Sequence, residues 1–113
     1  MSETTHTIPK HERMKIPRQS MPVQDAVARG RNYDEVALGY AEETAILEAS
    51  RCLQCKRPKC VEGCPVEVDI PAFIGRVAEG DMPGAVQALK ADNNLPAICG
   101  RVCPQETQCE VVC

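Results

Sequence analysis

The spacing of apolar residues changes near residue 34. From there onward apolar residues recur every three or four positions, which places them on one face of a helix, and acidic residues fill many of the intervals. The first stripe predicts a helix over about residues 41–51, and two shorter stripes predict helices over 70–79 and 82–91. No stretch alternates between apolar and polar residues for long enough to predict a strand. The pattern therefore predicts an all-α, loop-rich fold.

The helices over 70–79 and 82–91 have clear start and stop signals. Asp69 and Asp81 stand at the two N-cap positions, where a carboxylate can accept hydrogen bonds from the first free N–H groups. Pro71 lies in a first turn, where its missing N–H does no harm, and Gly80 stands where a glycine commonly ends a helix. Because the connection is so short, we expect these two helices to pack as a hairpin.

The segments on either side of this hairpin are less regular. Residues 52–68 hold four Cys, two Pro and one Gly, so we expect a ligand-bearing loop rather than a helix. After the hairpin, Asn93 or Asn94 can start a further helix, with Pro96 near its first position, and Pro104 stops that helix. A last short turn is expected over 107–113.

The first 33 residues have a different character from the remainder. Pro9, Pro17 and Pro22 interrupt any helix, so residues 1–33 are predicted to form an extended or partly disordered arm, and residues 34–113 a helical domain. The arm carries six basic and three acidic residues, whereas the domain carries seven basic and thirteen acidic residues. We therefore expect the arm to lie on a more acidic body. Nucleic-acid binding is not expected, since the arm has no dense basic run and no aromatic residue before Tyr33.

Composition limits how such a domain can be stabilised. In 113 residues there are three aromatic residues, no Trp and eight Cys, so a large apolar core is not expected and metal or disulfides should contribute. The N-terminus lacks the apolar region of a secretory signal, and no run approaches the ~18 apolar residues of a membrane span. We therefore expect a cytoplasmic protein without membrane attachment, in which cysteines serve as ligands.

The cysteines form two quartets. Their order is Cys52-x2-Cys55-x4-Cys60-x3-Cys64-Pro65, then Cys99-x3-Cys103-Pro104-x4-Cys109-x3-Cys113. Since each [4Fe–4S] cluster takes four thiolates, two quartets predict two clusters. In bacterial ferredoxins the Cys of a Cys-Pro step binds the other cluster, and both quartets here contain that step. This favours crossed ligation over one quartet per cluster.

Three other uses of the cysteines are less consistent with this spacing. Structural zinc prefers paired Cys knuckles and often His, but only Cys52 and Cys55 have the Cys-x2-Cys spacing, and His6 and His11 both lie in the arm. Disulfides are not expected in a cytoplasmic protein. Burial as small apolar residues can explain one or two cysteines, but not eight in ordered spacing.

The run RCLQCKRPKCVEGCPVEVDIPAFI, followed by NLPAICGRVCPQETQCEVVC, resembles the N-terminal iron–sulfur domain of the glutamate synthase small subunit. Similar domains occur in dihydropyrimidine dehydrogenase and in the NADPH-binding subunit of an electron-bifurcating ferredoxin:NADP oxidoreductase. The resemblance covers residues from about 33 to 113 and includes all eight cysteines and both Cys-Pro steps. It implies a helical, α-helical ferredoxin-like domain with two [4Fe–4S] clusters, placed ahead of FAD-binding and NADP(H)-binding domains.

The resemblance also implies a ligand set for each cluster. One cluster would receive Cys52, Cys55, Cys60 and Cys113. The other would receive Cys64, Cys103 and Cys109, with Cys99 as the candidate fourth ligand. Some members of the family instead use a non-cysteine oxygen ligand beyond the last cysteine. Thiolate suits iron–sulfur clusters better than an amide or carboxylate, which favours Cys99.

The sequence has no glycine-rich phosphate loop of the form G-x-G-x-x-G, so we expect a domain excised from a longer oxidoreductase and not catalytic alone. FAD and NADP(H) would belong to the missing downstream domains. The expected function is single-electron transfer from the flavin to a large catalytic subunit or a ferredoxin-type partner. The alternative function is a subunit-interaction module that zinc or a cluster stabilises and that carries no electrons.

Five basic residues lie beside the predicted ligands: Arg51, Lys56, Arg57, Lys59 and Arg101. Their positive charge would favour the reduced, more negative clusters. Equally, they could be solvated loop residues or bind acidic groups of a partner.

Overall fold

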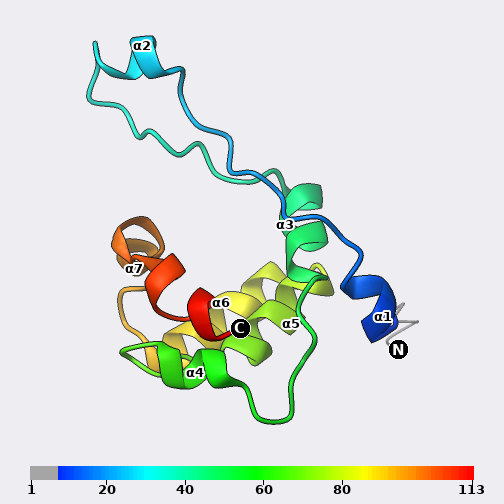
Figure 1. The fold of residues 1–113 in the computed structure, drawn as a ribbon. Helices are drawn as coiled ribbons and strands as arrows, with labels where there is room; N and C mark the ends of the chain where they lie inside the picture. The colour runs from blue at the N-terminus through cyan, green and yellow to red at the C-terminus, as the bar shows by residue number, and fades with distance from the viewer. Residues whose placement is uncertain (1–7) are drawn as a thin grey trace.

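Helices account for all the regular secondary structure in the computed structural model, which describes residues 8–113 (Figure 1). The α-helices and the two 3-10 helices are α1 Lys10–Arg13, α2 Ala26–Arg29, α3 Glu42–Ala49, α4 Lys59–Gly63, α5 Ile70–Ala78, α6 Met82–Asp92, α7 Pro96–Val102, η1 Gln105–Thr107 and η2 Glu110–Val112. Within the described residues, extended pairing is limited to one isolated antiparallel bridge between Val23 and Ala37. The prediction of an all-α, loop-rich fold is confirmed. None of the described helices is long and apolar enough to cross a membrane.

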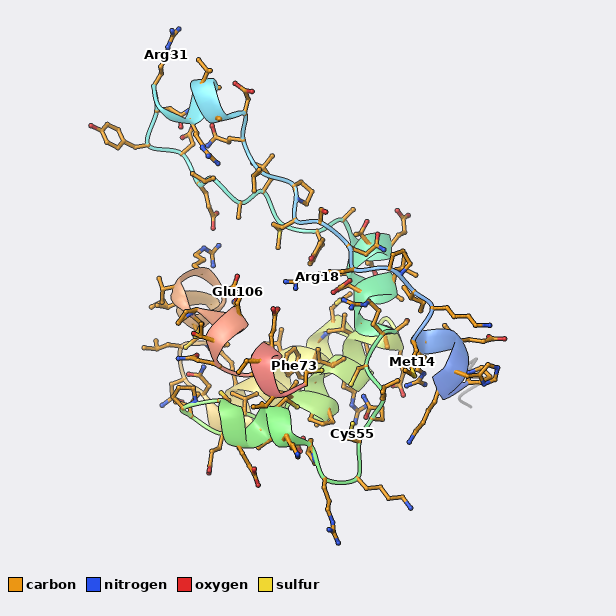
Figure 2. The ribbon with its side chains drawn as sticks, in the orientation of Figure 1. Met14, Arg18, Arg31, Cys55, Phe73 and Glu106 are labelled. Atoms are coloured by element: carbon orange, nitrogen blue, oxygen red, sulfur yellow. The ribbon has the colours of Figure 1, made fainter. Side chains whose placement is uncertain are left out.

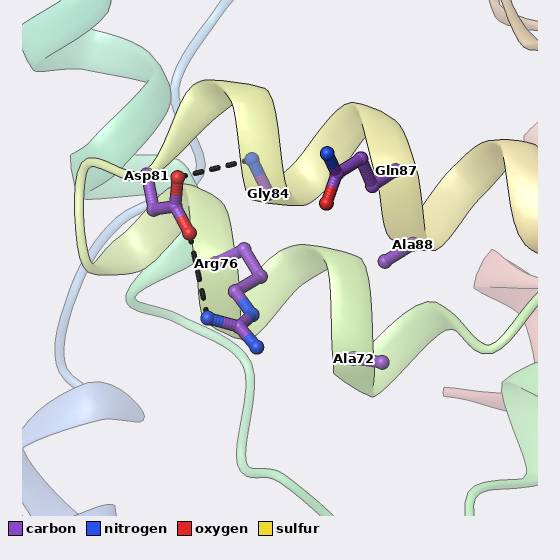
Figure 3. Close-up of a pocket in the computed structure, with 6 residues that line it drawn as sticks. All are labelled: Ala72, Arg76, Asp81, Gly84, Gln87 and Ala88. Carbon is purple, nitrogen blue, oxygen red and sulfur yellow. Dashed lines mark hydrogen bonds and ion pairs between the residues drawn. The ribbon is translucent and has the colours of Figure 1, made fainter.

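Helices α5 and α6 form the predicted hairpin, and their ends agree closely with the capping signals. The Asp69 carboxylate accepts a hydrogen bond from the Ala72 N–H at 3.3 Å, and the Asp81 carboxylate accepts one from the Gly84 N–H at 3.0 Å. Figure 3 shows that Asp81 also pairs with Arg76 of α5, across the shallow pocket between the two helices. At the turn, Gly80 has a φ of +79°, a conformation that glycine adopts without a steric cost. The two aspartates therefore fix the start of both helices.

The packed core is small and is made of short side chains. Helix α3 packs on α5, which in turn packs on α6, and the buried apolar residues of the described chain are Ala49, Val68 and Ala85. None of these side chains is aromatic, so little apolar surface is removed from water. A core of this size supplies little stability for a domain of this length.

The N-terminal arm contains short helices that the sequence pattern did not predict. Residues 1–7 of the predicted arm, including His6, lie outside the described residues. Helix α1 follows Pro9, and α2 is held by Asp25, whose carboxylate accepts hydrogen bonds from the Val27 and Ala28 N–H groups at 3.1 Å. Two helices of four residues each therefore form in the arm despite its three prolines.

Between α1 and α3 the chain leaves the body as a long extension with α2 at its tip (Figure 1). The outgoing and returning segments are joined by backbone hydrogen bonds from Gln24 N to Val36 O at 2.9 Å and from Leu38 N to Pro22 O at 2.7 Å. The extension gives the molecule an elongated shape, 48 Å by 28 Å by 28 Å.

The segment 52–68 is not the continuous loop that its cysteines and prolines suggested, because α4 interrupts it. Pro58 stands at the N-cap of α4, where its missing N–H has no helical partner to lose. Helix α4 packs against η2 near the C-terminal end of the chain. At Gly63 an added Cβ would lie 2.8 Å from the Gln108 carbonyl oxygen and 3.2 Å from the Cys109 Cα. Because Gly63 has no side chain, α4 can approach the segment around Cys109 closely.

Candidate metal centre

All eight cysteines are free thiols, and they lie at the ends of short helices or in the turns between them. Cys55 and Cys113 are exposed and the other six are half-buried; Figure 2 labels Cys55 in the loop that leads to α4. Their positions are Cys52 shortly after α3, Cys55 in that loop, Cys60 in α4, Cys64 directly after α4, Cys99 in α7, Cys103 directly after α7, Cys109 between η1 and η2, and Cys113 directly after η2. Short elements thus place thiols from both ends of the motif region on one body.

One group of neighbouring thiols includes Cys60. Burial raises the pKa of the Cys60 thiol, and the negative charges of Cys113 and Cys52 raise this pKa further. The backbone N–H of Val61 acts in the opposite direction, because it donates to the thiolate. Cys60 is therefore influenced by a thiol about fifty residues away in sequence, as well as by its own quartet.

A second group surrounds Cys103. Desolvation is the largest cause that raises the pKa of the Cys103 thiol. The charge of Cys99, a hydrogen bond with Cys99, and the charges of Cys64 and Cys109 raise this pKa further, in that order. Burial also raises the pKa of Cys109, where Glu110 and then Cys64 add to the effect. Cys64 thus acts on the thiols of the C-terminal quartet.

The two groups are neighbourhoods of thiols rather than closed sites for one ion. Among residues 8–113, no three His, Cys, Asp or Glu side chains converge on a point that could hold a single metal ion. A tetrahedral zinc site needs all its thiolates at about 2.3 Å from one atom. A [4Fe–4S] cluster is a larger group that is held by four separate thiolates around it.

Two side-chain amides donate hydrogen bonds to thiols, and neither was predicted from the sequence. Asn93 Nδ2 lies 3.2 Å from Cys99 Sγ, and Gln54 Nε2 lies 3.5 Å from Cys52 Sγ. In the sequence Asn93 is a candidate helix start, and Gln54 lies between Cys52 and Cys55. The sequence thus places Gln54, but not Asn93, beside predicted ligands, and it indicates neither residue as a donor.

Basic side chains connect the ligand segments to their surroundings. From the arm, Arg13 Nη1 donates to the Cys52 carbonyl at 2.8 Å, and Arg18 pairs with Glu110 at 3.2 Å. The second contact, labelled at Arg18 in Figure 2, is of the kind expected between a basic arm and a more acidic body.

Of the five basic residues that flank the predicted ligands, two form ion pairs within the chain. Arg51 pairs with Glu48 at 2.5 Å, and Arg101 pairs with Glu35 of the extension. Lys56, Arg57 and Lys59 are exposed. Ion pairing within the chain therefore accounts for Arg51 and Arg101 without a partner protein.

A small helical body that gathers eight free thiols from two quartets belongs to the class of iron–sulfur domains. Residues 29–113 match the family described as dihydropyrimidine dehydrogenase domain II, 4Fe-4S cluster, and the chain belongs to this family. The resemblance inferred from the cysteine motifs is thereby confirmed.

Relatives with known names support the same assignment. The chain is 38% identical over 96 residues to the small chain of NADPH glutamate synthase from Azospirillum brasilense, covering 84% of this chain and 20% of that protein. It is 32% identical over its full 113 residues to the Escherichia coli glutamate synthase small chain, covering 23% of that protein. It is 40% identical over 83 residues to the PreT subunit of NAD-dependent dihydropyrimidine dehydrogenase from Salmonella typhimurium, covering 73% of this chain and 20% of that protein. The chain thus spans about a fifth of the length of these relatives.

Proposed function

We propose that this chain binds two [4Fe–4S] clusters and passes single electrons as one domain of a larger oxidoreductase. The observation that carries the proposal is the packing of α4, which carries Cys60, against η2, which directly precedes Cys113. In agreement with this contact, the charge of Cys113 raises the pKa of Cys60, and the charge of Cys64 raises the pKa of Cys103. Eight thiols are the number that two cubane clusters require. The donor set therefore fits the group, since it consists of soft thiolates.

The proposed ligation is crossed between the quartets. Cys52, Cys55, Cys60 and Cys113 would hold the first cluster, and Cys64, Cys99, Cys103 and Cys109 would hold the second. The effects of Cys113 and Cys52 on the Cys60 thiol support the first set. The effects of Cys64 and Cys109 on the Cys103 thiol support the second set. Cys99, which lies one helical turn before Cys103, is proposed as its fourth member.

The chemistry of electron transfer would come from the clusters, which accept and release one electron at a time when bound. The contribution of the chain is to hold and partly desolvate the thiolates. Six of the eight cysteines are half-buried, and burial raises the pKa of Cys60 and Cys109. The contact between α4 and η2 holds both groups on one body, which fixes the separation between the two sites.

The larger protein is proposed to be a cytoplasmic, NADPH-dependent oxidoreductase of the glutamate synthase small-subunit type. The names of the relatives and the fifth of their length that this chain covers support this proposal. FAD and NADP(H) would bind in the remaining domains, and the electron acceptor would be a large catalytic subunit or a ferredoxin-type protein. In that arrangement a nicotinamide supplies electron pairs to the flavin, and the flavin supplies single electrons to this domain.

A second candidate function is a metal-stabilised subunit-interaction module without a redox role. The extension favours it, because this part of the chain projects from the body and carries exposed apolar side chains. These side chains belong to Val23, Val27, Tyr33, Val36 and Leu38. Such residues are common where a protein surface is covered by a partner.

Metal analysis after anaerobic purification separates the two functions. Electron transfer predicts a brown protein with about eight iron and eight sulfide per chain, following the count for two cubane clusters. Those clusters should be reduced by dithionite with a change in the electron paramagnetic resonance spectrum. A colourless protein that takes up stoichiometric zinc, but no iron and sulfide on anaerobic reconstitution, would contradict the electron-transfer proposal.

A further inference from the structure

The stretch between Cys55 and Cys60 is strongly basic. Three of its four residues carry a positive charge, namely Lys56, Arg57 and Lys59, and we call these three residues the basic segment. All three are exposed. Because the stretch joins two ligands of the proposed first cluster, its backbone has to pass close to that cluster.

The surrounding domain is acidic, which sets the basic segment apart. Residues 34–113 carry seven basic and thirteen acidic residues, so the segment holds three of the seven basic ones. Among the other four, Arg51, Arg76 and Arg101 pair with carboxylates of the chain. Within residues 8–113, no carboxylate pairs with a residue of the basic segment. Its charge is therefore available to a partner.

Helix stability does not explain this charge. Lys59 is the first residue of α4, and positive charge at the N-terminal end of a helix is slightly unfavourable, because the free N–H groups there are already positive. The acidic residue that suits this end of α4 is Glu62, in the first turn. A role in binding therefore accounts better for Lys59 than a role in the fold.

The basic segment lies beside an exposed ligand of the first cluster. Cys55 is exposed, whereas Cys64, Cys103 and Cys109 of the proposed second cluster are half-buried. Figure 1 shows the stretch between α3 and α4 as a bulge on the outside of the body, far from the extension, and Figure 2 labels Cys55 within it. Since electron exchange requires two centres to come close together, a partner at this bulge would exchange electrons with the first cluster.

We propose that the basic segment is a docking surface for an acidic one-electron carrier protein, and that the first cluster exchanges the electron with this carrier. The inference rests on the proposed function, since it assumes a first cluster on Cys52, Cys55, Cys60 and Cys113. Positive charge attracts an acidic surface before contact and orients it. In the exchange, one electron passes from the reduced cluster to the oxidised carrier, so the cluster is oxidised and the carrier is reduced. No covalent bond changes and no proton is transferred.

Binding of an acidic [2Fe–2S] ferredoxin tests the docking surface. The ferredoxin and the cluster-loaded protein are both kept oxidised, so no electron moves and a changed cluster potential cannot influence the result. Calorimetry compares the unsubstituted protein with two variants at about 0.1 M ionic strength, where exposed charges more than about 10 Å apart are largely screened. The first variant is Lys56→Glu/Arg57→Glu/Lys59→Glu. The control is Arg29→Glu/Arg31→Glu/Lys90→Glu, which makes the same change of charge at three exposed residues on the extension and on α6.

We expect the first variant to weaken ferredoxin binding by at least about tenfold, because like charges would then face each other at the interface. The control should weaken binding by less than about twofold, since its charges lie away from the interface and are screened. For the unsubstituted protein, an ionic strength of about 1 M should abolish binding, because the Debye length is then about 3 Å. Equal weakening in the two variants, or binding that survives high salt, would overturn the inference.

A second measurement needs no variant and so does not depend on whether the variants fold. Acetic anhydride modifies exposed lysines, and mass spectrometry of the unsubstituted, loaded protein then shows which lysines the ferredoxin covers. Lys56 and Lys59 should be protected, whereas Lys90 on α6 should not. A ferredoxin that does not bind, or that protects Lys90 as strongly as Lys56, would contradict the inference.

Iron and sulfide contents keep the two proposals distinct. If the unsubstituted protein binds no iron and sulfide, the proposed function fails. If it holds about eight of each and dithionite reduces it, but ferredoxin binding does not depend on the basic segment, the docking surface is wrong while the proposed function stands.

Discussion

Arg13 of the N-terminal arm donates a hydrogen bond from Nη1 to the backbone carbonyl of Cys52 at 2.8 Å. The same guanidinium donates from Nε to the Ile8 carbonyl at 2.6 Å. A planar group with several donors therefore links the arm to the first cysteine of the first quartet. The arm thus has a structural role in the segment that presents Cys52.

Replacing Arg13 should loosen the N-terminal ligand segment. Arg13→Ala removes a partly buried, charged hydrogen bond to the Cys52 carbonyl, which we expect to cost about 1–2 kcal/mol of unfolding free energy. The first cluster should then lose iron to a chelator faster than the second. Arg31→Ala is the matched control, since it removes the same charge at the tip of the extension (Figure 2). Equal iron loss in the two variants would contradict this role.

Cys113→Ala and Cys55→Ala should perturb the same cluster. Both residues belong to the proposed first set, so either substitution should remove or convert that cluster and spare the one on Cys64, Cys103 and Cys109. Spectroscopy of the two variants, loaded under the same anaerobic conditions, makes the comparison. If the two substitutions damage different clusters, the crossed ligation is wrong even though the iron–sulfur assignment stands.

Removal of the clusters should disorder residues 52–113. Within residues 8–113 the buried apolar residues are Ala49, Val68 and Ala85, which is too little core to order the cysteine-bearing segments without metal. We expect the apo chain to lose amide dispersion in nuclear magnetic resonance spectra and to lack the thermal transition of the loaded protein. An apo chain with the same dispersion and transition would show that the packing of α3, α5 and α6 suffices.

Gly63→Ala should destabilise the protein by about 1–3 kcal/mol, because the new methyl group would overlap the Gln108 carbonyl and the Val112 side chain. Calorimetry of the loaded protein measures the effect. Gly100→Ala in α7 is the control, since nothing lies within 4 Å of its added Cβ. At that position, alanine should be neutral or stabilise the helix by about 0.5–1 kcal/mol. Equal effects at the two glycines would mean that the approach of α4 to η2 does not depend on Gly63.

The sequence predicted the fold best where a helix or turn depends on residues that are close together in the chain. Asp69, Pro71, Gly80 and Asp81 predicted the α5–α6 hairpin because capping and turn formation act over a few residues. Helix α4 was missed, since its place is supported by packing on η2, which comes from the far end of the chain.

The candidate site was predictable to a similar degree. The spacing of the cysteines identified all eight thiols as ligand candidates, and it predicted iron–sulfur ligation without a structure. The donors Asn93 and Gln54 were not identified, because the role of each amide depends on which backbone group fixes its orientation. A sequence pattern does not specify such side-chain contacts.

The nearness of Cys113 to Cys60 has a consequence for biosynthesis. During translation, Cys60 is incorporated about fifty residues before Cys113, which corresponds to a few seconds at typical rates of synthesis. Under the proposed ligation, the nascent first site holds three thiols throughout that interval, while the second site is completed earlier, at Cys109. A nascent chain that stops between Cys109 and Cys113 would therefore hold all four proposed thiols of the second cluster but only three of those of the first.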